Sequence, residues 1–95
     1  MRLKNNPKAN DIVINSKYVN KEINFENDNK VCLEIGTGKC DFIINSAIKY
    51  PTINFIGVEK YDSVLVHGVK KLENLDLTNI KLLLFKSNKT PSTTL

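Results

Sequence analysis

The sequence of 95 residues predicts an α/β fold built on a parallel sheet, in the order β-α-β-α-β. Three apolar runs, at 30–35, 53–58 and 80–85, have the length and composition of strands. Two amphipathic segments, at about 39–50 and 62–74, separate these runs and predict helices. Because right-handed helical crossovers join parallel strands, we expect the strand order 3-2-1 with both helices on one face.

The stretch VCLEIGTGKCD at 31–41 organises the rest of the chain. Its apolar run stops at the turn Gly36-Thr37-Gly38, and a helical segment follows at once and ends before Pro51. An apolar strand, a glycine turn and a helix, in that order, build a crevice of nucleotide size in a parallel α/β sheet. We expect one apolar face on this helix, made of Ile43, Ile44, Ala47, Ile48 and Tyr50.

The second helical segment has Asp62 or Ser63 as its candidate N-cap. Its predicted inner stripe consists of Val64, Leu65, Val69 and Leu72, with Lys70 and Lys71 pointing outward. His67 lies off this stripe, which favours a solvated histidine over a metal ligand or a catalytic base.

Three parts follow along the chain. Residues 1–29 form a polar, basic lead-in, of which 1–10 are expected to be irregular and exposed, with one or two short helices starting near Asp11 or Ser16. Residues 30–85 form the α/β unit, and residues 86–95, rich in Ser, Thr and Pro, are predicted coil.

This unit has the character of half a doubly wound domain, truncated before its second half. A run such as Leu82-Leu83-Leu84-Phe85 points side chains to both faces of a sheet, as in sheets covered on both sides. The two helices cover only one face, and the strand at 30–35 has no predicted partner on its outer edge. Self-association or a partner chain could cover the bare face.

The amino-acid composition limits the classes of protein to which this chain can belong. With 41% hydrophobic and 25% charged residues, the chain resembles a soluble globular domain. We find neither an apolar run long enough to cross a bilayer nor a signal-peptide region, and we expect a cytoplasmic location. Cys32 and Cys40, with the distant His67, lack the number and spacing of metal ligands, so we predict no metal site.

The net charge of +4 is mild, but the first ten residues carry Arg2, Lys4 and Lys8 without an acid. These three side chains are candidates for contact with RNA phosphates, because such binding rests on Lys and Arg displacing counterions. Simple solvation of a polar terminus is the alternative interpretation.

Two phosphate-binding signatures fail at the glycine turn. A Walker loop requires glycine at position 33, which is Leu33, and Ser or Thr at position 40, which is Cys40. A dinucleotide fingerprint requires glycine or alanine at position 41, where Asp41 would meet the pyrophosphate.

The E-x-G-x-G pattern of class I methyltransferases fits Glu34, Gly36 and Gly38. Their cofactor, S-adenosylmethionine, carries an ammonium and a sulfonium and has no pyrophosphate, so an acid before the turn can interact with its positive end. Glycine at both positions allows close approach of the backbone. Glu59, at the end of the second strand, can accept hydrogen bonds from both ribose hydroxyls.

The segments LEIGTGKCDFI and YPTINFIGVEKYDSVL, with the opening MRLKNNPKA, resemble the bacterial tRNA (guanine-N7)-methyltransferase family. The resemblance covers residues 1–9 and about 31–85. It implies a Rossmann-like, S-adenosylmethionine-dependent enzyme that methylates N7 of a guanine in the tRNA variable loop. It also implies that Glu34 and Glu59 are two of the cofactor carboxylates.

The sequence departs from this family at several positions. Lys86 stands where a third acid is usual near the adenine, with the polar Asn88 close by, and Cys40 replaces a common glycine. The family's catalytic Asp-Pro-Trp-Pro motif and a later Thr-Asp segment are absent. The resemblance therefore implies no catalytic residue in this chain, which by itself should not turn over.

Three hypotheses remain open. The first is an N-terminal, cofactor-binding fragment of such an enzyme, truncated or frameshifted after Phe85. The second is a non-catalytic module that binds the cofactor or RNA. The third is a small α/β subunit that requires a partner chain.

Overall fold

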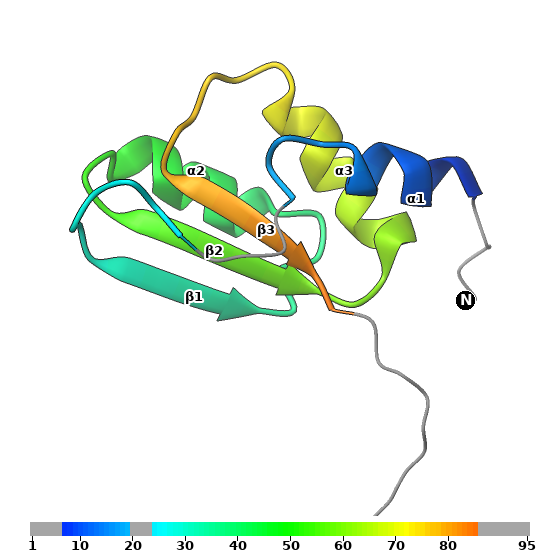
Figure 1. Ribbon diagram of the computed structural model, residues 1–95, viewed down its shortest axis with the longest axis horizontal. Helices are drawn as coiled ribbons and strands as arrows, with labels where there is room; N and C mark the ends of the chain where they lie inside the picture. Colours follow the sequence, from blue (N-terminus) through cyan, green and yellow to red (C-terminus); the bar gives the residue numbers. More distant parts are fainter. Residues whose placement is uncertain (1–6, 20–23, 86–95) are drawn as a thin grey trace, which may run out of the picture.

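The computed structural model describes residues 7–19 and 24–85 (Figure 1). It confirms the α/β class with a parallel three-stranded sheet. The elements, in chain order, are α1 (Pro7–Ile14), β1 (Val31–Ile35), α2 (Asp41–Lys49), β2 (Asn54–Glu59), α3 (Asp62–Leu72) and β3 (Ile80–Leu84). The strands lie in the order β1-β2-β3, so β2 is central.

The strand register brings the carboxyl ends of all three strands to one edge of the sheet. Ile35 of β1 lies opposite Val58 of β2, and Glu59 lies opposite Leu84 of β3. The glycine turn after β1 and the acid at the end of β2 are therefore neighbours in space, although they are far apart in the sequence.

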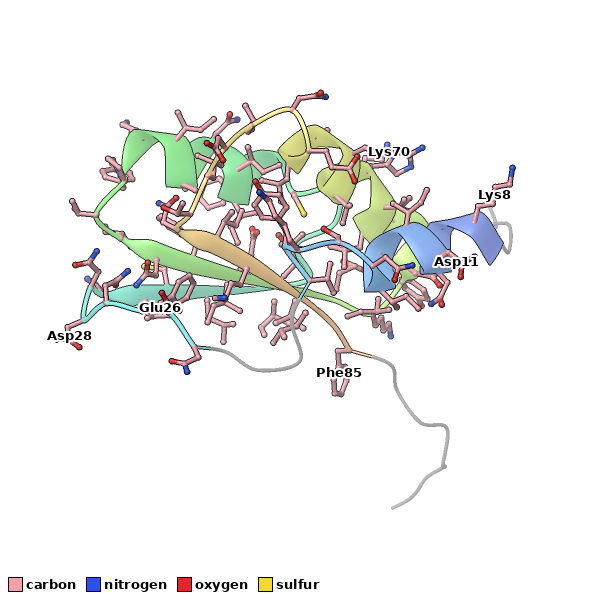
Figure 2. All side chains as sticks on the ribbon, turned by 45° about the horizontal axis from the view of Figure 1, so that its top comes forward. Lys8, Asp11, Glu26, Asp28, Lys70 and Phe85 are labelled. Atoms are coloured by element: carbon pink, nitrogen blue, oxygen red, sulfur yellow. The ribbon has the colours of Figure 1, made fainter. Side chains whose placement is uncertain are left out.

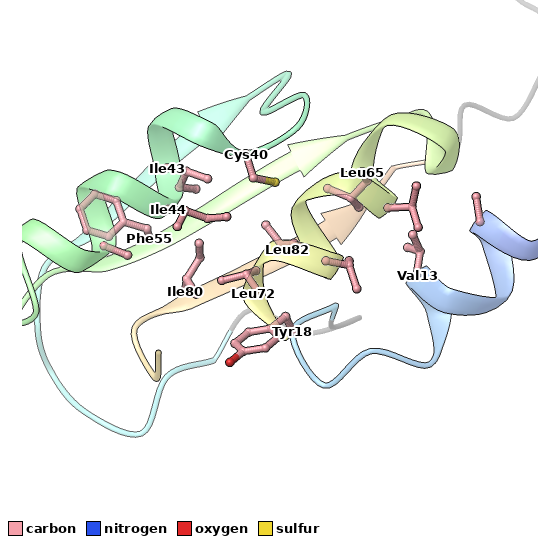
Figure 3. Packing of buried hydrophobic residues seen from close by; sticks show 14 residues of the cluster. Val13, Tyr18, Cys40, Ile43, Ile44, Phe55, Leu65, Leu72, Ile80 and Leu82 are labelled. Carbon is pink, nitrogen blue, oxygen red and sulfur yellow. The ribbon is translucent and has the colours of Figure 1, made fainter. Parts of the chain in front are cut away.

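One hydrophobic core lies between the sheet and the helices α2 and α3 (Figure 3). Phe55, Ile80 and Leu82 enter it from the strands, and Leu65 and Leu72 enter it from α3. Because both helices share this core, they cover the same face of the sheet, as Figure 1 shows.

The prediction of the apolar face of α2 is partly wrong. Ile43, Ile44 and Ala47 are buried as predicted, but Ile48 is 51% and Tyr50 46% exposed. Ile48 lies about 90° around the helix from the mean direction of the three buried residues. Tyr50 is the C-cap and lies beyond the last helical turn.

The start and the inner face of α3 also differ from expectation. Leu65, Val69 and Leu72 are buried as predicted, together with Val66, whereas Val64 is only half-buried. The N-cap is Tyr61, whose side chain makes no capping hydrogen bond, and Asp62 is already helical. The helix starts early because the N–H groups of Val64 and Leu65 both donate to the carbonyl of Tyr61.

Residues 7–10 are helical, which corrects the prediction of an irregular, exposed segment over 1–10. Helix α1 begins at Pro7, a residue suited to the first helical position because its fixed φ is already helical. Ala9 and Val13 are fully buried, and the side-chain amide of Asn10 donates to Asp62 at 2.9 Å. The figure shows α1 packed beside α3 (Figure 1).

Residues 18 and 19 lie along the outer edge of β3. Val19 forms an isolated parallel bridge with Leu82, whose N–H donates to the carbonyl of Tyr18 at 2.7 Å. The Tyr18 hydroxyl donates to the carbonyl of Leu75 at 3.0 Å. The chain thus covers part of the β3 edge with its own N-terminal segment.

At Gly68, helix α3 packs closely against Cys40, the N-cap of α2. A Cβ at this glycine would lie 2.3 Å from Sγ and 2.7 Å from Cβ of Cys40. Gly57 of β2 has a related role, because a Cβ there would lie 2.9 Å from Oγ1 of Thr37. Both glycines make room for residues of the turn between β1 and α2.

Replacing Gly68 with alanine should destabilise the protein. Alanine gains about 1 kcal/mol in helix propensity over glycine, but overpacking typically costs about 1–3 kcal/mol. Because both close contacts involve Cys40, we expect Cys40→Gly to restore stability in the double variant. Urea unfolding followed by circular dichroism measures the stability of the unmodified protein, the two single variants and the double variant. Additive effects of the two substitutions would contradict the packing described above.

Candidate functional site

The turn from Gly36 to Gly38 joins β1 to α2 at the carboxyl edge of the sheet. The N–H groups of Gly36 and Thr37 both donate to the carbonyl of Val58, at 2.7 and 2.9 Å. Gly36 and Gly38 have left-handed φ values of 74° and 61°. A Cβ at either glycine would meet nothing within 4 Å, so the turn presents bare backbone to open space.

Glu34 is half-buried near the end of β1. Its Oε1 accepts a hydrogen bond of 2.6 Å from the hydroxyl of Thr37. Thr37 is itself only 7% exposed and packs against Gly57 of β2. This bond fixes the carboxylate beside the glycine turn, where the sequence predicts a cofactor contact.

Thr37 is the residue that sequence reasoning missed. It occupies the variable position between the two glycines, so the E-x-G-x-G pattern gives it no role. The sequence does place a hydroxyl three residues after Glu34. This spacing could have predicted the contact, since a carboxylate and a hydroxyl across a tight turn can form a hydrogen bond.

Glu59 is only 8% exposed, and both its oxygens accept backbone hydrogen bonds. Oε1 accepts from the N–H of Gly38 at 2.9 Å, and Oε2 accepts from the N–H of Tyr61 at 3.3 Å. The side chain therefore ties the glycine turn to the β2–α3 connection. The sequence predicts a ribose contact for Glu59, and this holding role is an additional one.

Cys40 is fully buried at the start of α2 and has a left-handed φ of 71°. Its N–H donates to the carbonyl of Thr37 at 2.9 Å, which closes the turn. Glycine would adopt this left-handed backbone without strain, whereas the Cβ of cysteine disfavours it. Burial raises the pKa of the Cys40 thiol to about 11.

Lys71 does not simply point outward, which corrects its expected placement. It pairs with Asp41 at the start of α2, and its ammonium donates to the carbonyl of Lys39 at 3.3 Å. The hydrogen bond and the charge of Lys71 lower the pKa of Asp41. Asp41 also lies in the first turn of α2, where the helix dipole favours a negative charge.

The remaining candidate residues lie away from the turn or outside the described residues. Lys8 is exposed on α1 and extends from the far end of that helix (Figure 2), and His67 is exposed on α3. Arg2, Lys4, Lys86 and Asn88 lie outside the described residues. Within residues 7–19 and 24–85, no three potential ligands gather around a metal position, and no helix could span a membrane.

The fold and the turn together define a class: a parallel α/β unit with a glycine turn and two carboxylates at the carboxyl ends of β1 and β2. A family model described as "Putative methyltransferase" matches residues 28–91, which is more than half of the chain. The chain therefore belongs to this methyltransferase family.

Curated relatives share a tRNA (guanine-N(7)-)-methyltransferase name. The protein of Bacillus licheniformis is 39% identical over 98 residues, covering 93% of this chain and 46% of its own length. The protein of Lysinibacillus sphaericus is 38% identical over 94 residues, which cover 87% of this chain and 44% of the relative's own length. This chain therefore spans slightly less than half the length of these relatives.

Solved structures support the fold alone. An antibiotic-related methyltransferase superposes with a TM-score of 0.55 at 18% identity, over 96% of this chain and 42% of its own. Phosphoethanolamine N-methyltransferase 2 of Haemonchus contortus, in complex with S-adenosyl-L-methionine, superposes with a TM-score of 0.54 at 11% identity. The superposition covers 83% of this chain and 17% of that protein.

The buried thiol should make stability depend on pH in alkaline solution. A folded pKa of about 11, raised from 9.0, leaves stability unaffected below pH 9 and reduces it as the pH rises from 9 to 11. The full loss is of the order of 3 kcal/mol. Cys40→Ala should lose less stability over the same interval, since its other titrating groups are unchanged. Parallel stability–pH curves for the two proteins would contradict this burial effect.

Proposed function

We propose that this chain is the cofactor-binding half of an S-adenosylmethionine-dependent tRNA (guanine-N7)-methyltransferase. One observation carries the proposal: the bare backbone of Gly36 and Gly38 faces open space, with Glu34 and Glu59 beside it. Membership of the methyltransferase family and the names of the relatives support it.

The hydrogen bonding of the turn favours a cationic ligand over a phosphate. A phosphate-binding loop points its N–H groups at the ligand. Here the N–H groups of Gly36, Thr37 and Gly38 already donate to Val58 and Glu59. The carboxylates of Glu34 and Glu59 lie beside the turn. These hydrogen-bond acceptors fit the ammonium and sulfonium of S-adenosylmethionine, which has no pyrophosphate.

The chemistry requires little proton transfer. When bound, the cofactor supplies an electrophilic methyl group on its sulfonium. Guanine N7 has an in-plane lone pair and needs no deprotonation, so catalysis depends on positioning and electrostatics. In this proposal Glu34 binds the positive end of the cofactor, and Glu59 contacts the ribose and holds the turn in shape.

The tRNA would be held mainly by groups that this chain does not include. The described residues place no base-binding side chain at the turn, and we assign no catalytic residue to them. Arg2, Lys4 and Lys8 are proposed phosphate contacts, and a cytoplasmic location stays a prediction.

Calorimetry with S-adenosylmethionine tests the cofactor site. We expect the chain to bind this ligand and not NAD. Glu34→Gln keeps an oxygen that can accept from Thr37 but removes the charge, and it should weaken binding by roughly 10-fold, which corresponds to about 1.4 kcal/mol. The exposed Glu26 supplies a control, since Glu26→Gln should bind as tightly as the unmodified chain.

Two results would count against this assignment. One is no heat of binding at millimolar S-adenosylmethionine, and the other is equal loss of affinity in both variants. A methyl-transfer assay with tRNA accompanies the titration, and we expect cofactor binding without methylation from these 95 residues. Methylation by this chain alone would contradict our assignment of no catalytic residue to residues 7–19 and 24–85.

A further inference from the structure

The two carboxylates beside the glycine turn belong to neighbouring strands, which sets the direction in which a ligand can span them. Glu34 lies in β1 and Glu59 ends β2, and β3 lies on the other side of β2. In S-adenosylmethionine the base and the sulfonium chain are attached to opposite sides of the ribose. A cofactor with its positive end at Glu34 and its ribose at Glu59 therefore carries its base away from β1, toward the connection from β2 to α3.

Tyr61 is the aromatic residue of this connection. Its N–H donates to Oε2 of Glu59 at 3.3 Å, so its backbone lies beside the carboxylate to which the proposed function gives the ribose. Tyr61 is the N-cap of α3, but its side chain makes no capping hydrogen bond, and the residue is 48% exposed. A half-exposed ring thus lies within reach of a base attached to that ribose.

A lysine covers part of this ring. The ammonium of Lys60 lies 5.3 Å from the centre of the Tyr61 ring. A cation attracted to one face of a ring leaves the other face open to a planar ligand. The same local arrangement occurs at Tyr50, which is 46% exposed and has the ammonium of Lys49 at 5.5 Å. Tyr50 is the C-cap of α2 and precedes β2, so it lies at the opposite edge of the sheet.

The exposed ring of Phe85 is also tied to Glu59, but it projects from the other face of the sheet. Its N–H donates to the carbonyl of Glu59 at 2.9 Å, and the side chain lies exposed at the end of β3 (Figure 2). Side chains alternate between the two faces of a strand. Leu82, three residues earlier, is in the core, so Phe85 faces away from it. Phe55, four residues before Glu59, is in the core, so Glu59 shares the core face and Phe85 does not.

We infer that Tyr61 is a further binding residue of the cofactor site and that its ring stacks on the adenine of S-adenosylmethionine. The inference rests on the proposed function, because it takes Glu59 as the ribose contact. Aromatic side chains bind bases by stacking, since every base has a planar π-face. The hydrogen bond from the Tyr61 N–H to Glu59 links the two contacts, because one carboxylate both binds the ribose and positions the backbone of the stacking residue.

The ligand 5′-methylthioadenosine tests the stacking contact, because it keeps the adenine and the ribose but has neither the sulfonium nor the ammonium. In calorimetry we expect Tyr61→Ala to weaken binding of this nucleoside and of S-adenosylmethionine by roughly 10-fold. Tyr61→Phe keeps the ring and should bind both ligands as the unmodified chain does. Tyr50→Ala is the matched control and should leave both affinities unchanged. Glu34→Gln should weaken binding of S-adenosylmethionine only.

NMR of the unmodified chain gives a readout that does not depend on how the variants fold. Stacking places the ring protons of Tyr61 in the ring current of the adenine, which shifts their signals upfield. The chain has three tyrosines, so substitution of each by phenylalanine assigns the ring signals. We expect an upfield shift of the Tyr61 signals on addition of 5′-methylthioadenosine and none of the Tyr50 signals.

The outcomes separate this inference from the proposed function. If the unmodified chain binds neither ligand at millimolar concentration, the proposed function fails and the inference fails with it. If it binds both ligands, but Tyr61→Ala binds them as tightly as Tyr50→Ala does, only the stacking role is overturned. An equal loss of affinity in Tyr61→Phe and Tyr61→Ala, or the absence of a ring shift at Tyr61, would also overturn it.

Discussion

The hydrogen bond between the N–H of Gly38 and the carboxylate of Glu59 is the interaction on which the site depends. It crosses from the turn after β1 to the end of β2, and the other oxygen of Glu59 extends the connection to Tyr61, the N-cap of α3. A buried carboxylate is stable when backbone donors satisfy it. One side chain thus fixes the relative position of the glycine turn, the central strand β2 and helix α3.

This constraint also determines what the turn can bind. Hydrogen bonds inside the protein already engage the N–H groups of Gly36, Thr37 and Gly38, and the carboxylates of Glu34 and Glu59 lie beside the turn. The same sequence of strand, turn and helix serves phosphate-binding proteins, but there the donors face the ligand. Here the local electrostatics favour a cationic ligand, which agrees with membership of a methyltransferase family.

The elements that could be predicted from sequence are those fixed by local pattern. Three apolar runs and a glycine turn were sufficient for the parallel sheet, because each depends on neighbours in the sequence. The helix at Pro7 was missed because the burial of Ala9 depends on contact with α3, which the local sequence does not show. The exposure of Ile48 and the role of Thr37 likewise depend on tertiary packing. The cofactor contacts of Glu34 and Glu59 stay predictions.

The most direct test of this account is amide NMR of the labelled chain during titration with S-adenosylmethionine. We expect the largest shift changes at Gly36 of the turn and at Gly38 and Tyr61, whose N–H groups donate to Glu59. We expect little change at Ala9 in α1. Largest changes along α1, or no changes at millimolar ligand, would contradict the assignment of the glycine turn as the cofactor site.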